Sequence, residues 1–196
     1  MHASHRPRLV ALFGMGVLLA GCGSAVQAAS THHKKHHAAA VAHVKKVSKS
    51  TAPTGAVPPF IASQDPTAKT VTLSLVAGAT IDNQYYNFDG YDQGNATITV
   101  PAGWTVKVNF SNESGSSHSV VIAPSPNVLT PVFVGAASPD PSVGLQAGQA
   151  QSFQFVAQTP GSYVLACGIP GQASQDGMWV KFVVSASAAQ AGSQLP

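Results

Sequence analysis

Few cysteines and few charged residues occur in this chain, and each shortage excludes a class of protein. The 196 residues include only two cysteines, Cys22 and Cys167. Because Cys22 belongs to an N-terminal signal-like segment, the folded part keeps one thiol and no internal disulfide. Charged residues make up 9% of the chain. Beyond residue 50, three lysines oppose all seven carboxylates, so no basic surface for nucleic acid is expected.

The N-terminus has the pattern of an export signal. A cationic start is formed by His2, His5, Arg6 and Arg8. An apolar run over residues 9–20 follows, which is too short to span a bilayer comfortably. It ends in Leu-Ala-Gly-Cys22, which resembles the lipobox of bacterial lipoproteins. We expect residues 1–22 to be a lipoprotein signal peptide with Cys22 lipidated, giving a cell-envelope lipoprotein on the periplasmic or outer face of a membrane. An ordinary secretory signal cleaved after Ala28 is the alternative.

Residues 23–59 form a low-complexity linker between this signal and the rest of the chain. Small residues dominate it, and large apolar groups that would offset the ordering entropy are scarce. The linker contains the tract Thr31–His37 with four histidines, followed by His43. Such a tract either binds a transition metal weakly or serves as a solvated cationic stalk. Both interpretations stay open.

The body of the chain is predicted to be an all-β sandwich. Apolar and polar residues alternate with period two over residues 70–76, 96–100, 105–110 and 152–155. Shorter or more continuously apolar runs cover residues 119–122, 162–166 and 178–184. Turn residues separate these runs, and no amphipathic helix stands out. We expect the domain to cover residues 60–186, with an irregular excursion over 123–142 and a C-terminal tail over 187–196.

Three residue types with an affinity for copper stand at suggestive positions in the body. Cys167 follows one expected strand, Met178 opens the last one, and His118 lies in a loop far upstream. Blue-copper centres use two histidine nitrogens, one thiolate and a weak axial methionine or amide oxygen. In a sandwich, an early strand end supplies one histidine, and a loop between the last two strands supplies the other ligands. The order of these three residues satisfies that topology.

Residues 86–184 resemble the sulfocyanins, which are membrane-associated blue-copper proteins of the cupredoxin group. The motifs that carry the resemblance are Tyr86–Tyr91, Val100–Trp104, Ser117–Val120, Pro160–Tyr163, Cys167–Gly171 and Gly177–Trp179. The resemblance implies a cupredoxin-type Greek-key β-sandwich that binds one copper ion for electron transfer. It assigns His118, Cys167 and Met178 as metal ligands.

The sequence departs from the sulfocyanin pattern at Gln172. The family has a histidine after Pro-Gly, where this chain has glutamine, and four residues then lead to the methionine, where this chain has five. His118 is the only histidine after residue 43. An amide oxygen is a weaker and harder donor than imidazole, so we expect lower affinity for Cu(II) and a relative preference for Cu(I).

Three functions remain open at this point. The first is a lipid-tethered electron carrier with a redox partner protein, and the second is a lipoprotein that captures Cu(I) and delivers it to a copper-handling protein. The third is a metal-free binding module, in which His118 caps a turn, Cys167 and Met178 fill the core and Gln172 braces a loop. We predict that the protein is not an enzyme, because no triad spacing and no carboxylate pair stand out.

Overall fold

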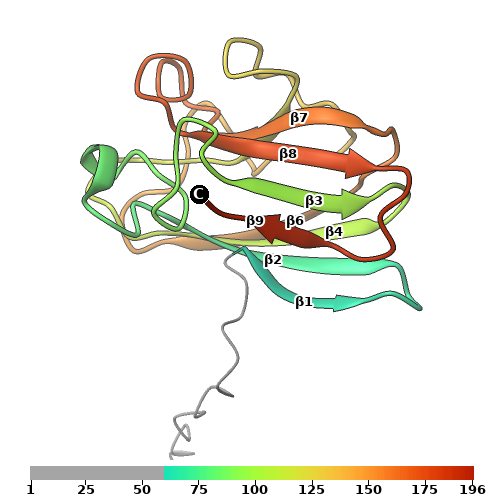
Figure 1. Ribbon diagram of the computed structural model, residues 1–196. Coiled ribbons are helices and arrows are strands. Elements are labelled where there is room, and N and C mark those ends of the chain that lie inside the picture. The colour runs from blue at the N-terminus through green and yellow to red at the C-terminus, as the bar shows by residue number, and fades with distance from the viewer. Residues whose placement is uncertain (1–59) are drawn as a thin grey trace, which may run out of the picture. The chain divides into compact units, whose positions relative to one another are not determined.

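Residues 60–196, which the computed structural model describes, build two facing β-sheets (Figure 1). The signal peptide, the linker with its histidine tract, and lipidation at Cys22 lie outside the described residues and stay predictions. Within residues 60–196, no helix combines the length and apolar character needed to cross a membrane. A short 3₁₀ turn, η1 (Asp82–Tyr85), is the helical element of this part of the chain.

The first sheet has the strand order β1-β2-β4-β6. These strands are β1 (Ile61–Asp65), β2 (Thr70–Ala77), β4 (Thr105–Asn112) and β6 (Ala150–Val156). β2 and β4 run parallel, and the other neighbours are antiparallel. Parallel neighbours cannot be joined by a tight hairpin, so the chain crosses to the other sheet between them.

The second sheet has the strand order β5-β7-β8-β3-β9. It consists of β3 (Thr97–Pro101), β5 (Val121–Ala123), β7 (Gly161–Ala166), β8 (Trp179–Ser185) and β9 (Gly192–Gln194). β3 is parallel to β8 and antiparallel to β9. The all-β sandwich expected from the sequence is therefore confirmed.

Two strands escape the sequence analysis because they bury almost no side chains. Only the first residue of β1, Ile61, is buried. β9 is Gly-Ser-Gln and falls in the stretch assigned to a tail, where it pairs residues 192–194 with residues 97–99 of β3. Backbone pairing is the main hold on such strands, supplemented in β1 by the bonds between the Gln64 side chain and Ala191, and it leaves no apolar alternation to detect. The folded part thus extends beyond residue 186.

The core lies between the sheets and is built from alternate residues of the long strands. β2 and β4 point Leu73, Leu75, Val108 and Phe110 inward, each at most 1% exposed. The facing sheet contributes Phe182 and its buried neighbours on β3, β7 and β8. This period-two burial is the pattern of a sheet with one buried face.

The stretch between β5 and β6 is irregular, as expected from its prolines. It crosses the outer side of β5 and β7, where Val121, Ala166 and Ala173 form a second apolar cluster with Leu129 and the partly buried Trp179. Phe133 from the same stretch stacks on a phenylalanine of β6, with ring centroids 5.9 Å apart. The excursion therefore covers apolar surface that strands alone would leave in water.

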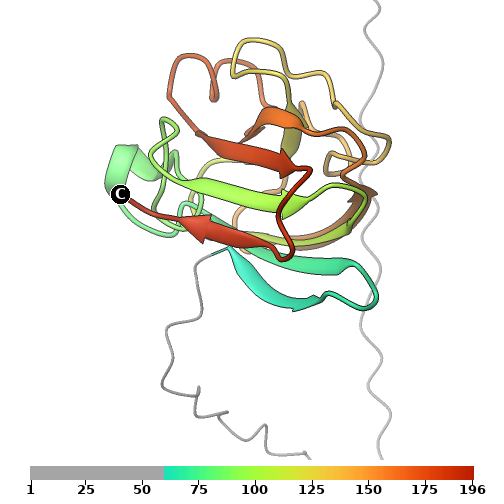
Figure 2. The same ribbon diagram turned by 45° about the vertical axis from the view of Figure 1, so that its right-hand side comes forward.

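The two ends of the sandwich differ. Figures 1 and 2 show short connections at one end and a crowd of longer loops at the other, which lies on the left in Figure 1. At the loop end, β2, β4 and β7 finish, whereas β3 and β8 begin. The loop after β7, the turn η1 and the segment after β4 thus meet there.

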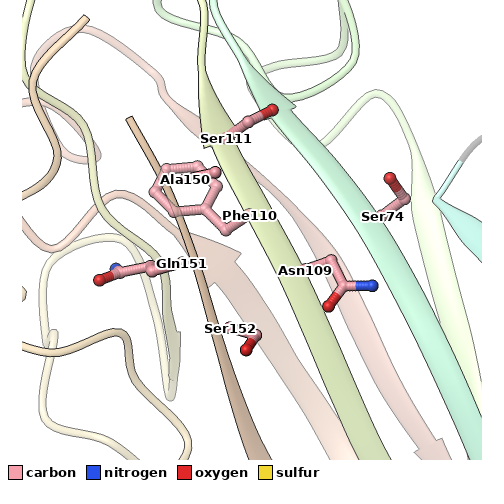
Figure 3. A pocket seen from close by; sticks show the side chains of 7 residues that line it. All are labelled: Ser74, Asn109, Phe110, Ser111, Ala150, Gln151 and Ser152. Atoms are coloured by element: carbon pink, nitrogen blue, oxygen red, sulfur yellow. The ribbon is translucent and has the colours of Figure 1, made fainter. Parts of the chain in front are cut away.

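A hollow on the outward face of the first sheet carries no candidate ligand (Figure 3). The labelled side chains on this face include Ser74, Asn109 and Ser152, which lie side by side on β2, β4 and β6. Hydroxyl and amide groups of this kind keep the outer face polar and soluble. The candidate metal ligands lie elsewhere in the fold.

Candidate metal centre

The three side chains of His118, Cys167 and Gln172 meet at the loop end. His118 lies between β4 and β5, Cys167 follows β7, and Gln172 lies in the loop that leads to β8. Gln172 Oε1 is 2.7 Å from His118 Nδ1 and 3.0 Å from Cys167 Sγ. Residues separated by up to 54 positions therefore converge on a single oxygen atom.

The hydrogen bonds at Gln172 define the protonation of its neighbours. An amide oxygen only accepts hydrogen bonds, so His118 Nδ1–H and the Cys167 thiol both donate to it. Gln172 Nε2 donates to the carbonyl of Ser117 at 3.1 Å, which fixes the orientation of the amide. These hydrogen bonds place a proton on His118 Nδ1 and on the Cys167 sulfur, and both protons are directed at one carbonyl oxygen.

His118 is fully buried and held on three sides. Its backbone N–H donates to Leu145 O at 3.1 Å, and its carbonyl accepts from Leu145 N at 2.7 Å. The ring of Tyr86 meets the imidazole edge-on, with centroids 5.8 Å apart and planes at 86°. Burial lowers the pKa of His118, although the hydrogen bond to Gln172 opposes that shift. His118 Nε2 has no hydrogen-bond partner among the described residues.

Cys167 is also fully buried, and its sulfur has a defined environment. Burial raises the pKa of the thiol, backbone N–H groups including that of Ser119 oppose the shift, and the carboxylate of Asp176 reinforces it. The N–H of Ser119 lies 3.4 Å from Sγ. An N–H directed at sulfur favours the thiolate once a cation replaces the proton.

The Ser119 hydroxyl joins the loops that surround the sulfur. It donates to Pro141 O at 2.6 Å and accepts from Gly168 N at 2.8 Å, while its oxygen lies 3.6 Å from Cys167 Sγ. Three segments distant in sequence are thereby tied together beside one buried sulfur. Buried polar networks of this kind restrict the positions of their members when every group is satisfied.

Met178 is next to the site through its backbone. Its N–H donates to Gln172 O at 2.9 Å, and its carbonyl accepts from Cys167 N at 3.0 Å. The side chain is fully buried within the main core cluster. Met178 therefore belongs to the same hydrogen-bonded loop as Cys167 and Gln172.

The sequence analysis named these four residues but missed those that position them. Ser117, Ser119 and Tyr86 lie inside the quoted motifs, yet nothing in their residue types indicated contacts with a buried imidazole or thiol. Asn112 was also missed, and it is fully buried at the end of β4. Its amide donates to Ser116 O at 2.6 Å and to Leu145 O at 2.8 Å, which holds the loop that carries His118.

A conformationally strained turn borders the site. Asn83, Gln84 and Tyr85 have φ angles of 48°, 55° and 69°, although none is glycine. Each such residue costs roughly 1–2 kcal/mol in the left-handed region. Strained backbone persists only where its surroundings hold it in place, and it is enriched at functional sites.

The donor set suits copper, especially Cu(I). Among residues 60–196, no three His, Cys, Asp or Glu side chains gather closely enough to hold a metal ion. The candidate set is mixed: one imidazole, one thiol, one amide oxygen and the thioether of Met178, whose backbone bonds to Gln172 and Cys167. Thiol and thioether sulfur select Cu(I), and imidazole accepts either oxidation state of copper. Imidazole, sulfur and amide oxygen already converge, so the residues fit a small soft cation.

Comparison with known proteins gives a consistent result. The family model of the sulfocyanin (SoxE) domain matches residues 60–191. Sulfocyanin from Sulfolobus acidocaldarius is 32% identical over 129 residues, covering 60% of this chain and 64% of that protein, just under two thirds of its length. Rusticyanin from Acidithiobacillus ferrooxidans is 34% identical over 123 residues, covering 58% of this chain and 76% of that protein. The solved structure of auracyanin A, a blue copper protein from Chloroflexus aurantiacus, is 19% identical, covers 59% of this chain and 99% of that one, and has a TM-score of 0.41.

Proposed function

Because the chain belongs to the sulfocyanin (SoxE) domain family, we propose that this cupredoxin binds one copper ion and transfers single electrons at a site altered by Gln172. Cys167, His118 and Met178 are the proposed ligands. Gln172 stands where the sulfocyanin pattern has its second histidine and supplies a weak oxygen donor. The proposed partner is a redox protein that exchanges one electron with the copper site.

The observation that carries this proposal is the convergence on Gln172 Oε1. An imidazole nitrogen and a thiol sulfur lie 2.7 Å and 3.0 Å from the same oxygen. A protein that used these residues only for packing would have no need to bury an imidazole beside a thiol. The family membership explains the pairing, because blue-copper sites bind the ion through both imidazole nitrogen and thiolate sulfur.

The residues of the chain prepare the site in two ways. Burial of His118 and Cys167 excludes water, which keeps both donors neutral until a cation arrives. Ser119 and Leu145 fix the donors through hydrogen bonds, so little movement accompanies a change of charge. Copper, when bound, supplies the one-electron couple. Gln172 weakens the site for Cu(II), because its neutral oxygen replaces an imidazole.

Copper titration of the purified full-length chain tests the proposal. Adding Cu(II) should give a visible thiolate-to-copper band and a copper electron-spin signal, and Cys167→Ala should abolish the band. Gln172→His should strengthen the band and raise the Cu(II) affinity. A wild-type protein that stays colourless, and a Gln172→His variant that also stays colourless, would refute copper-based electron transfer.

Capture and delivery of Cu(I) is a second candidate, favoured by the neutral and soft donors. Burial raises the pKa of the thiol and lowers the pKa of the imidazole, and both shifts favour the uncharged forms; Met178 is buried, and its backbone bonds to Gln172 and Cys167. Such a set suits Cu(I) better than Cu(II). Competition for Cu(I) with a chelator separates the two: tight Cu(I) binding without a reversible reduction wave indicates delivery to a copper-handling protein. Affinity no better than that of Cys167→Ala would indicate a metal-free module.

We further propose that the protein is held at the cell envelope by a lipid on Cys22. The Leu-Ala-Gly-Cys sequence supports this, and residues 23–59 are long enough to separate the domain from a membrane. Labelling cells with a fatty-acid analogue should mark the wild type and not Cys22→Ala. Release of the wild-type protein in unlabelled form would favour ordinary secretion.

A further inference from the structure

The carbonyl groups around Met178 are held by a segment far away in the sequence. Asn83 Nδ2 donates to Asp176 O at 2.6 Å, Gln93 N donates to Gly177 O at 2.8 Å, and Gly94 N donates to Trp179 O at 3.0 Å. All three donors lie within residues 80–94, the clamp segment. Met178 itself bonds to Gln172 and Cys167. The backbone that carries the thioether is therefore fixed from both sides.

The clamp segment is braced internally against its own strain. Asn87 is fully buried, and its amide donates to Thr80 O at 2.9 Å and to Asp82 O at 2.8 Å. Asn83 Nδ2 also donates to Tyr86 O at 2.9 Å. These bonds hold the left-handed residues 83–85 in a conformation that they would otherwise leave.

The clamp segment and the loop before β8 are in close contact at two glycines. A Cβ atom on Gly94 would lie 2.4 Å from the ring of Trp179, and a Cβ atom on Gly177 would lie 2.5 Å from the Gln93 side chain. Both glycines also have positive φ. Only glycine lets the backbone of one segment approach a side chain of the other this closely, so a shift of the clamp segment at these contacts is transmitted to residues 177–179.

The same segment also touches the opposite side of the site. Tyr86 packs edge-on against the imidazole of His118. The clamp segment therefore contacts both the neighbours of Met178 and the ring of His118. His118 is the first of the proposed ligands along the chain, and Met178 is the last.

We propose that the clamp segment sets the position of the Met178 sulfur relative to His118 and Cys167, with Asn83 as its positioning residue. The proposal rests on the proposed function, in which these three residues bind copper. It assigns a role to the strain at residues 83–85: the left-handed turn directs the Asn83 amide at Asp176 O. Loosening this bond would free the Met178 thioether, while the thiol of Cys167 and the imidazole of His118 stay in place.

Asn83→Gly tests this inference in the full-length protein. Glycine tolerates the positive φ but removes the amide donor. Gln84→Gly is the matched control, because Gln84 has a φ of 55° and an exposed side chain. Asn83→Asp is a second variant that keeps the size and the left-handed tendency of asparagine and lacks the N–H₂ group.

Two measurements are compared across the variants. In the metal-free protein, both Asn83 variants should speed hydrogen exchange of the Met178 amide about tenfold or more relative to Gln84→Gly, because local opening becomes easier. In the copper-loaded protein, they should change the intensity ratio of the thiolate-to-copper bands and shift the reduction potential, whereas Gln84→Gly should not.

The two arms distinguish failure of the clamp from failure of the copper proposal. Met178 exchange and copper spectra equal to those of Gln84→Gly in both Asn83 variants would overturn the positioning role. A wild-type protein that takes up no copper would defeat the proposed function, and Met178 exchange would then decide the clamp alone.

Discussion

The strands and the loop end of this domain are stabilised by different means. In β2 and β4, every second side chain is buried and, except for Asn112 at the end of β4, apolar, whereas the outward residues other than Val76 are polar. At the loop end, fully or nearly buried polar side chains replace this alternation, and they are Asn87, Asn112, Ser114, His118, Ser119 and Ser138. Asn87, Asn112, His118 and Ser119 each form hydrogen bonds with backbone or side-chain groups of other residues.

The contrast shows how stability and site geometry are divided. Apolar burial is non-directional and tolerates substitutions that preserve volume. Hydrogen-bonded buried amides and hydroxyls demand particular partners at particular distances. Core substitutions should therefore change stability more than the site, and loop substitutions should do the reverse.

The largest effect is expected from Phe110→Ala in the core. Phe110 is 1% exposed and packs against Phe88 with ring centroids 6.4 Å apart. Loss of the ring should lower the free energy of unfolding by about 3–5 kcal/mol, measured by urea denaturation. The folded fraction should keep the copper spectrum of the wild type. A changed spectrum would show that the core and the loop end are not separate in this way.

The next effect is a pH dependence that originates in Asp89, which follows η1. Burial raises its pKa from 3.8 to about 7, opposed by a hydrogen bond from Val76 N and assisted by the charge of Glu113. Oδ1 accepts that bond at 2.9 Å, and Oδ2 is buried without a hydrogen-bond partner among residues 60–196. The folded state therefore favours the protonated carboxyl.

The sign of this effect follows from the raised pKa. The contribution of Asp89 to the free energy of unfolding is fully present below about pH 4 and is lost as the pH rises through about 7. At about 1.4 kcal/mol per pKa unit, the upper bound is about 4 kcal/mol. His118, whose pKa is lowered, acts in the opposite direction below its ordinary pKa of 6.5. Comparing the wild type with Asp89→Asn between pH 4 and 8 isolates Asp89, and parallel curves would contradict the prediction.

A smaller effect on stability is expected from Asn112→Ala. The substitution removes one of the two hydrogen bonds accepted by each of the carbonyls of Ser116 and Leu145, and it leaves the buried N–H of Ser114 without its acceptor. Unfolding free energy should fall by about 2 kcal/mol, the usual cost of unsatisfied buried groups. The copper spectrum should change more than it does in Phe110→Ala. The Asn112→Asp variant keeps the acceptor oxygen and loses the donor N–H₂ group. Its free energy of unfolding should lie between that of the wild type and that of Asn112→Ala.

The smallest effect is expected on the outward face shown in Figure 3. Asn109 and Ser152 face each other across β4 and β6, and both are exposed. Asn109→Thr and Ser152→Thr should change stability by less than about 0.5 kcal/mol, as is usual for surface positions. A loss above 1 kcal/mol in thermal unfolding would reveal an unrecognised role for this hollow.

The sequence predicted the strands well where burial produces a regular pattern. All seven expected strands occur, and the irregular stretch between β5 and β6 occurs as well. The two strands that were missed, β1 and β9, have one feature in common. Most of their side chains are exposed or only partly buried, so neither strand shows an alternation of apolar and polar residues. Pairing of β9 with β3 depends on tertiary contacts that no local pattern encodes.

At the site, residue type identified the donors but not what surrounds them. His118, Cys167 and Gln172 were named from their chemistry and from the family pattern, and the structure brings these three together. Asn83 and Asn112 act through side-chain bonds to backbone carbonyls as far as 93 positions away. Any asparagine offers the same amide, so its sequence gives no sign of which carbonyl it will reach.

The long reach of the bond between Asn83 and Asp176 has a consequence for biosynthesis. The two residues are 93 positions apart, and the parallel pairing of β3 with β8 spans a similar length. Such non-local pairs close late and make folding slow. In a nascent polypeptide that has not yet emerged past β8, the residues proposed to bind copper are not yet assembled, so we expect copper loading to follow synthesis of β8.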